Sequence, residues 1–114
     1  MKESRFWKKI KAGLLSAANY DIHLVRVENS VCPGTPDLNG CYRGKEFWLE
    51  LKVGRNKLSA VQHLWANKRI AAGGRVFNLR QRTTYIGLYQ GDLLLYSWNP
   101  RCMDFTQLLK FLTN

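Results

Sequence analysis

Apolar side chains at helical spacing predict three helices in this chain of 114 residues. The predicted helices cover residues 3–18, 59–72 and 103–112. Ser59 is a favourable N-cap residue for the second helix, and the Gly73-Gly74 pair ends it. The side chains of this helix that we expect to cover a sheet are Val61, Leu64, Trp65 and Ala72.

Between these helices, alternating apolar and polar residues bounded by glycine and polar turns predict β-strands. The predicted strands cover residues 23–28, 36–41, 46–52, 75–79, 83–89 and 93–98, and a loop covers residues 29–35. Arg43-Gly44 and Gln90-Gly91 are the predicted hairpin turns. With a mass of 13.2 kDa and 46% hydrophobic residues, the chain is expected to form a single domain over residues 1–114.

Two acidic residues, Asp37 and Glu50, lie on the first predicted hairpin of an otherwise basic chain. If Arg43-Gly44 forms a two-residue turn, Asp37 lies directly opposite Glu50, because the two are equally far from the turn. A turn one residue longer would shift this pairing. Side chains alternate along a strand, so Trp48, Glu50 and Lys52 share one face, and Phe47, Leu49 and Leu51 form the better core face.

The acidic pair has two interpretations. A solvated strand face is the common explanation for alternating charged residues. Like charges directly opposite each other, however, destabilise a sheet by up to about 1 kcal/mol. A divalent cation reverses the sign of that interaction, and Mg²⁺ often binds one or two carboxylates together with water and phosphate oxygens. We therefore expect Asp37 and Glu50 to bind Mg²⁺, with the Leu51 carbonyl as a third protein ligand and Lys52 orienting the attacking water.

Two more residues are candidates because of their places on the predicted helices. Glu3 extends the apolar stripe of the first helix, so its carboxylate either points toward the hairpin as a third acidic ligand or only favours the helix dipole. Gln62 lies in the first turn of the second helix, near the end of the Lys52 strand. Its amide would hold the lysine or a phosphate oxygen; the alternative is an ordinary surface glutamine.

The charge composition indicates a polyanionic binding partner. The 18 Lys and Arg residues against 8 Asp and Glu residues give a net charge of +10 and a pI near 9.9. This charge favours nucleic acid, although membrane-surface and ribosomal proteins are equally basic. The residues expected to contact DNA phosphates are Arg43, Lys45, Arg55, Lys57, Lys68, Arg69, Arg80 and Arg82.

Signals for export or for a membrane span are not expected in this sequence. Its apolar runs are far shorter than the ~18 residues of a membrane helix, and its N-terminus lacks the apolar core of a secretion signal. The three cysteines, Cys32, Cys41 and Cys102, show no paired spacing and are expected to be reduced thiols. We expect a cytosolic protein, in a bacterium or in a phage-infected host.

The order of these motifs resembles a known nuclease family. Gly34-Thr35-Pro36-Asp37, Glu50-Leu51-Lys52, Gln62 and Gly73-Gly74-Arg75-Val76 follow one another within residues 34–79. This arrangement resembles the virus-type replication-repair nucleases, the VRR-NUC branch of the PD-(D/E)XK superfamily. The resemblance implies an α/β fold with a restriction-endonuclease-like core, in which helices flank a mixed central β-sheet.

The same resemblance implies Mg²⁺- or Mn²⁺-dependent hydrolysis of DNA. It implies Asp37 and Glu50 as metal ligands, Lys52 as the catalytic lysine and Gln62 as a supporting residue, and Glu3 matches a glutamate in the family's N-terminal helix. Small stand-alone members, often from phages, resemble homodimeric Holliday junction resolvases, which is the function we expect. The alternatives are a monomeric flap or nicking endonuclease, a basic DNA-binding module without catalysis, and an RNA-binding protein whose aromatic residues stack on bases.

Overall fold

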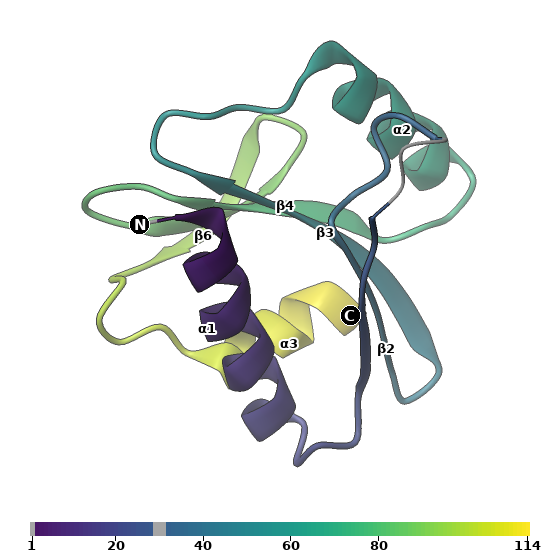
Figure 1. The fold of residues 1–114 in the computed structure, drawn as a ribbon. Helices are drawn as coiled ribbons and strands as arrows, with labels where there is room; N and C mark the ends of the chain where they lie inside the picture. The colour runs from purple at the N-terminus through teal and green to yellow at the C-terminus, as the bar shows by residue number, and fades with distance from the viewer. Residues whose placement is uncertain (1, 29–31) are drawn as a thin grey trace.

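The computed structural model describes residues 2–28 and 32–114 (Figure 1). Its elements are α1 (Glu3–Ala17), β1 (His23–Arg26), β2 (Leu38–Tyr42), β3 (Lys45–Val53), α2 (Ala60–Ala71), β4 (Val76–Gln81), β5 (Ile86–Gln90), β6 (Leu93–Trp98) and α3 (Phe105–Thr113). The predicted loop over residues 29–35 has its first part, residues 29–31, outside the described residues. No helix in the described part of the chain is long and apolar enough to cross a membrane.

The strands form a six-stranded sheet in sequence order, β1-β2-β3-β4-β5-β6. Only β3 and β4 pair in parallel among these strands, and all the other neighbours are antiparallel. A parallel pair needs a crossover connection, and α2 provides it over one face of the sheet. Helices α1 and α3 pack against each other and cover the opposite face (Figure 1). The predicted α/β fold with a mixed, helix-flanked sheet is therefore confirmed.

The main core lies between the sheet and the α1–α3 layer. Phe6, Ile10 and Leu14 recur along α1 at helical spacing and are fully buried. They belong to the same core cluster as Phe47 and Leu49 of β3, which are also fully buried. Each such side chain contributes about 1.5–3 kcal/mol through burial. The predicted core face of β3 is thus correct, and it leaves the opposite, polar face of β3 turned toward α2.

The hairpin turn has the predicted length. Arg43 and Gly44 both have positive φ, 52° and 77°, as a two-residue type I′ turn requires. Tyr42 pairs with Lys45 directly across the turn, and Leu38 pairs with Leu49 farther along. The register on which the Asp37–Glu50 argument depends is therefore confirmed.

Helix α2 begins at the predicted N-cap but is rotated differently from our expectation. Ser59 and Gln62 form a capping box, in which the Oγ atom of Ser59 accepts a hydrogen bond from the backbone amide of Gln62 at 3.2 Å. Ala66, one turn after Gln62, is the buried residue of the helix, whereas Val61 and Leu64 are 46% and 55% exposed. The prediction that Val61, Leu64 and Ala72 cover the sheet was wrong, because the sheet face beneath α2 is polar and Gln62 faces it. Trp65 does pack against a strand, since its ring lies on Trp48 of β3.

Two further boundaries differ from the prediction in ways that matter below. Strand β4 continues to Gln81, so Arg80 lies within the sheet and not in a surface loop. Gln90 pairs with Leu93, so the turn of the β5–β6 hairpin is Gly91-Asp92, one residue later than predicted.

Candidate active site

Asp37 immediately precedes β2 and is held by two neighbouring strands. Its carbonyl oxygen accepts a hydrogen bond from the Val27 amide at 2.7 Å, which holds the backbone beside β1. Its carboxylate oxygen Oδ2 accepts a hydrogen bond from the Leu51 amide at 3.0 Å. The hairpin register, continued by one residue, places Asp37 opposite Glu50. The two predicted acidic residues therefore meet on one surface.

Gly34 sets the position of the segment that leads to Asp37. Its φ is +89°, and a Cβ atom there would lie 2.5 Å from the carbonyl oxygen of Val61. Both the backbone conformation and the close approach exclude a larger residue. The loop before Asp37 consequently rests directly on the first turn of α2, which carries Gln62.

Glu50 projects from the polar face of β3 and is only 5% exposed. Its Oε2 lies 3.4 Å from Nε2 of Gln62 and 3.9 Å from Nζ of Lys52, and both distances are long for strong pairing. Burial, followed by the hydrogen bond with Asp37 and repulsion from it, raises the pKa of Glu50 to about 9, although Lys52 opposes the shift. Without a cation, Glu50 therefore retains a proton at neutral pH.

Gln62 connects the capping of α2 to this carboxyl group. Its Oε1 accepts a hydrogen bond from the Ser59 amide at 2.9 Å, so its amide nitrogen is the group left to face Glu50. We had predicted that Gln62 holds the lysine or a phosphate oxygen. In the structure, Nε2 of Gln62 lies 3.4 Å from Oε2 of Glu50, so the amide faces this carboxyl group, and the contact with the lysine or a phosphate oxygen stays a prediction.

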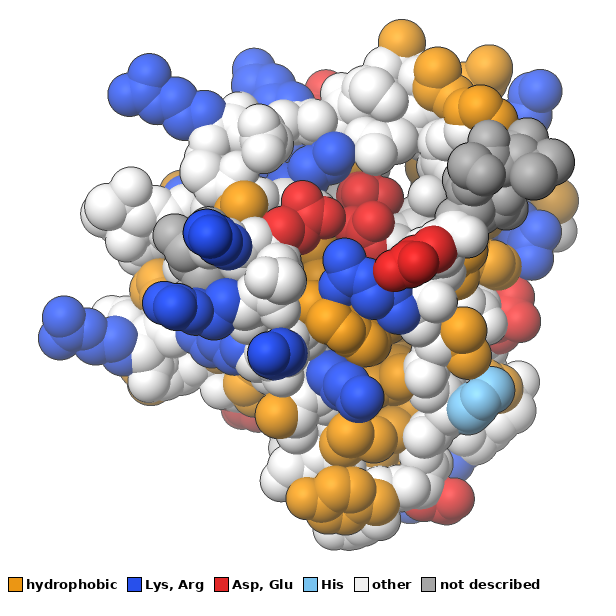
Figure 2. Space-filling view, viewed as in Figure 1, with side chains coloured by type: hydrophobic (Ala, Val, Ile, Leu, Met, Phe, Trp, Pro, Cys, Tyr) orange, Lys and Arg blue, Asp and Glu red, His pale blue; other side chains and the backbone are white. Residues whose placement is uncertain are grey.

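Glu3, in the first turn of α1, lies close to Asp37 and Lys52. Burial first, and then repulsion from Asp37, raises the pKa of Glu3, while Lys52 and Arg26 oppose the shift. Hydrogen bonding to Asp37 contributes least to raising the pKa of Glu3. Figure 2 shows acidic side chains gathered on this face with lysine and arginine side chains around them. Three acidic groups from three segments thus converge here.

The donor set suits a hard divalent cation with a partly hydrated shell. Within residues 2–28 and 32–114, no group of three or more His, Cys, Asp or Glu side chains is arranged to hold a metal ion, so Glu3 does not form a three-carboxylate site with Asp37 and Glu50. A cation here would depend on the Asp37 and Glu50 carboxylates, with the Leu51 carbonyl and water completing its coordination. Mg²⁺ accepts this combination, since it commonly keeps several waters and binds one or two carboxylates.

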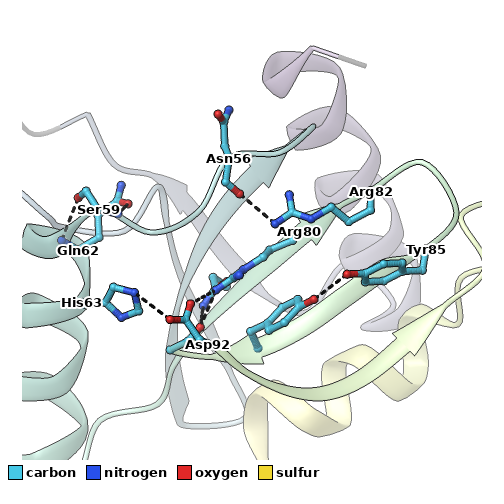
Figure 3. A network of polar contacts seen from close by, with 11 residues as sticks. Asn56, Ser59, Gln62, His63, Arg80, Arg82, Tyr85 and Asp92 are labelled. Atoms are coloured by element: carbon cyan, nitrogen blue, oxygen red, sulfur yellow. Dashed lines mark hydrogen bonds and ion pairs between the residues drawn. The ribbon is translucent and has the colours of Figure 1, made fainter.

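Two of the residues predicted to contact DNA have structural partners instead. Arg80 is 5% exposed, and its guanidinium donates to Asn78 and Asp92 (Figure 3). Its prediction as a phosphate contact was wrong, because β4 carries its side chain beneath the β5–β6 turn. Arg82 donates to the carbonyl oxygens of Gly54 and Asn56 at 2.6 and 3.0 Å, so it ties down the loop after β3.

The other predicted DNA contacts lie on the surface and remain predictions. Arg43 and Lys45 are exposed at the tip of the β2–β3 hairpin, and Arg55 and Lys57 are exposed just beyond the Lys52 end of β3. Lys68 and Arg69 are exposed on α2. These cations lie at both ends of the strand that carries Glu50, which suits a polyanion laid along β3.

Sequence reasoning missed Asn78 and Arg26. Asn78 is 2% exposed and pairs in register with Glu50 across the parallel β3–β4 pair. The alternation of Asn78 and Arg80 along β4 matches that of Glu50 and Lys52 along β3, and this period-two pattern is a signal that predicts a shared polar face. Arg26 lowers the pKa of Glu3, a contact between α1 and β1 for which the sequence offers no local signal.

The fold that carries this site is shared with a known resolvase. The structure of Hjc, a Holliday junction resolvase from the archaeal hyperthermophile Archaeoglobus fulgidus, is similar with a TM-score of 0.57 over 92% of each chain, at 15% sequence identity. No protein-family model matches the sequence, and the search of curated proteins finds no match. The expected restriction-endonuclease-like core is confirmed, whereas membership of the VRR-NUC branch stays a prediction.

Proposed function

We propose that the chain is a metal-dependent endonuclease that hydrolyses phosphodiester bonds in branched DNA. The observation that carries the proposal is the buried Glu50 carboxyl group, which lies against Asp37 and beside Lys52 on one face of the sheet. The resolvase-like fold supports a nuclease, and the net charge of +10 supports a polyanionic substrate. The motif order over residues 34–79 further supports a place among the phage-type VRR-NUC nucleases.

The residues divide the chemistry between them. Asp37 and Glu50 would hold Mg²⁺, for which Mn²⁺ is expected to substitute, with the Leu51 carbonyl; the ion would polarise the phosphate and lower the pKa of a bound water. Lys52, whose side chain is 16% exposed, can donate to the attacking water or to a phosphate oxygen. Gln62 holds one oxygen of Glu50 in place, and Glu3 supplies a third carboxylate beside Asp37.

We further propose that the substrate is a four-way junction and that the active form is a homodimer. A two-fold dimer presents two identical sites, as paired cuts across a symmetric junction require. Exposed apolar side chains support an interface on the side of α2 and β6, namely Val61, Leu64, Leu93 and Leu94. Nε2 of His63 on α2 lies 3.6 Å from Oδ2 of Asp92 in the β5–β6 turn, so α2 and the start of β6 are neighbours. A monomer in sedimentation analysis would favour the flap or nicking alternative.

The test is cleavage of labelled four-way junction, 5′ flap and linear duplex DNA in Mg²⁺, Mn²⁺ or EDTA. We expect paired, metal-dependent nicks in the junction. Lys52→Ala should lower the rate at least about 100-fold with the fold intact, and Asp37→Asn should abolish cleavage while junction binding is retained or strengthened. Lys110→Ala, an exposed lysine on α3, is the matched control and should cut normally.

Three results would change the proposal. Unchanged cleavage by purified Lys52→Ala would remove the mechanism. Preference for the flap would keep the nuclease and discard the resolvase. Tight binding without cutting on any substrate would leave a DNA-binding module.

A further inference from the structure

A pair of tryptophans lies next to the candidate site and has no role in the chemistry described above. Trp48 precedes Glu50 by two residues on the same face of β3, about 7 Å away along the strand. Trp65 of α2 packs against it, with ring centroids 5.1 Å apart and an interplanar angle of 63°. Both indoles are half-buried, whereas Trp98 is 7% exposed in the core. Part of each ring therefore remains open to solvent.

Arg69 lies over both rings. Its guanidinium carbon is 5.3 Å from the Trp48 centroid and 5.6 Å from the Trp65 centroid. The guanidinium also lies 3.4 Å from Oε1 of Glu46, the same oxygen that accepts a hydrogen bond from Nε1 of Trp48 at 3.1 Å. The side chains of Arg69 and Glu46 are 45% and 52% exposed, so this ion pair is a weak surface contact that a ligand can displace.

Two hollows flank this cluster. One, of about 430 Å³, lies against Trp48 and Arg69 and is bounded by Arg75 and the Gly73-Gly74 turn. The other, of about 260 Å³, lies against Trp65 and Lys68. Each hollow therefore combines an aromatic wall with cationic side chains. This combination fits a flat, aromatic ligand attached to a phosphate.

We propose that the Trp48–Trp65–Arg69 surface stacks an unpaired nucleobase of the DNA substrate. Indole rings and a guanidinium plane stack on any base, and Lys68 and Arg75 can pair with the flanking phosphates. The position of Trp48 beside Glu50 places the stacked nucleotide next to the bond that is cut. The choice of DNA as ligand rests on the proposed nuclease function, but the stacking itself does not require cleavage.

The first experiment measures how far binding depends on the bases. Fluorescence anisotropy in EDTA compares labelled oligothymidylate with an abasic deoxyribose-phosphate oligomer of the same length. We expect the wild-type chain to bind the oligothymidylate about tenfold more tightly. Trp48→Leu should reduce this preference to less than about twofold, and Trp48→Phe should keep most of it. Equal wild-type affinities, or a preference unchanged in Trp48→Leu, would overturn the proposal.

Trp7→Leu is the matched control. Trp7 is also half-buried, but it lies on α1, on the other side of the sheet. Loss of one indole from that helix should leave the base preference intact. A comparable loss of preference in Trp7→Leu would show that any tryptophan substitution weakens binding, and it would overturn the assignment to Trp48.

A second measurement covers the case in which Trp48→Leu does not fold, because Trp48 also packs against α2. 2-Aminopurine is placed either in a single-stranded arm or within the duplex of a flap substrate, and the wild-type chain is added in EDTA. We expect its fluorescence to be quenched in the arm and restored in Arg69→Gln, which alters only an exposed side chain. Equal responses in arm and duplex, or quenching unaffected by Arg69→Gln, would contradict stacking at this surface.

The two proposals fail separately. A chain that cuts branched DNA with Mg²⁺ but binds the abasic oligomer equally well keeps the nuclease function and loses the stacking surface. A chain that prefers bases and cuts nothing keeps the stacking surface and loses the nuclease function.

Discussion

Glu50 and Arg80 are two buried ionisable residues on neighbouring parallel strands, and their hydrogen-bond and charge partners differ. Each is 5% exposed, and both belong to the polar side of the sheet that α2 partly covers. Burial of a charged group is costly unless that group is paired and hydrogen-bonded. The partners of each residue therefore show whether its position serves the fold or serves a ligand.

The surroundings of Arg80 are complete. Its Nε donates to Oδ1 of Asn78 at 2.7 Å, and its Nη2 donates at 2.8 Å both to the Gly91 carbonyl and to Oδ1 of Asp92 (Figure 3). Its guanidinium carbon lies 4.1 Å from the centroid of the Tyr89 ring. This set of contacts neutralises the cation and joins β4 to the β5–β6 turn, so Arg80 stabilises the fold.

The surroundings of Glu50 are incomplete by the same standard. Its contacts with Gln62 and Lys52 are 3.4 and 3.9 Å long, and Asp37 adds a second negative charge. Burial and the neighbouring Asp37 together raise the pKa of Glu50. A buried ionisable side chain without balancing partners, and not burial alone, therefore distinguishes a ligand site from a structural ion pair.

Removal of each ionisable group in turn should change stability in opposite directions. Arg80→Met leaves the buried Oδ1 of Asn78 without its donor and removes one of the two donors to the Gly91 carbonyl, and it should lower the free energy of unfolding by about 2–3 kcal/mol. Glu50→Gln replaces a carboxyl group that ionises readily in the unfolded chain but not in the fold, and it should raise that free energy, on the order of 1 kcal/mol, in metal-free buffer at pH 8. Urea unfolding in EDTA measures both. Destabilisation of similar size in the two variants would show that both charges are structural.

The pH dependence of metal-free stability should also separate Glu50 from Arg80. The folded pKa of Glu50, about 9, lies above its ordinary value of 4.5. Its contribution to stability is therefore complete below about pH 4.5 and is lost as the pH rises through about 9. Mg²⁺ should restore stability at alkaline pH, because the ion replaces the proton between the carboxylates. Thermal unfolding from pH 5 to 9, with Mg²⁺ or EDTA, measures the effect, and Glu50→Gln should abolish it. A wild-type profile identical to that of Glu50→Gln would contradict the raised pKa.

Asp92→Asn should have the smallest effect, because Asp92 is exposed and Arg80 keeps two neutral acceptors. The hydrogen bond from Arg80 lowers the pKa of Asp92 below its usual 3.8, with His63 assisting and desolvation opposing. The stabilisation it provides is present above pH 3.8 and disappears as the pH falls through the lowered pKa. Wild type and variant should therefore differ slightly in urea unfolding at pH 6 and converge in acid. A decrease in the free energy of unfolding as large as that of Arg80→Met would mean that Asp92 is the main partner that stabilises buried Arg80.

The sequence predicted those parts of the site that depend on local rules. The turn at Arg43-Gly44 determined the register, and strand alternation placed Glu50 with Lys52, away from the core. The Ser59 cap placed Gln62 at the start of α2. Each of these inferences needed only neighbouring residues, and the structure confirms each of them.

Features that depend on distant contacts were not predictable in the same way. An arginine in a basic chain gives no sign that a turn eleven residues later will cover it, so Arg80 was assigned to the surface. The rotation of α2 follows from the contact between Gln62 and Glu50, and apolar spacing alone placed Val61 and Leu64 incorrectly. Metal binding, dimer formation and the preferred DNA structure remain predictions.

The two-residue turn at Arg43-Gly44 also has a consequence for the order of folding. Asp37 and Glu50 come together through the β2–β3 hairpin, a local contact of a kind that forms in roughly 1–10 μs. Gln62 can reach them only after the slower, less local pairing of β3 with β4 has brought α2 across the sheet. The refolding chain should therefore assemble its two carboxylates while they are still hydrated, and bury them only in a later step. During that interval the acidic pair is accessible to a cation before the sheet is complete.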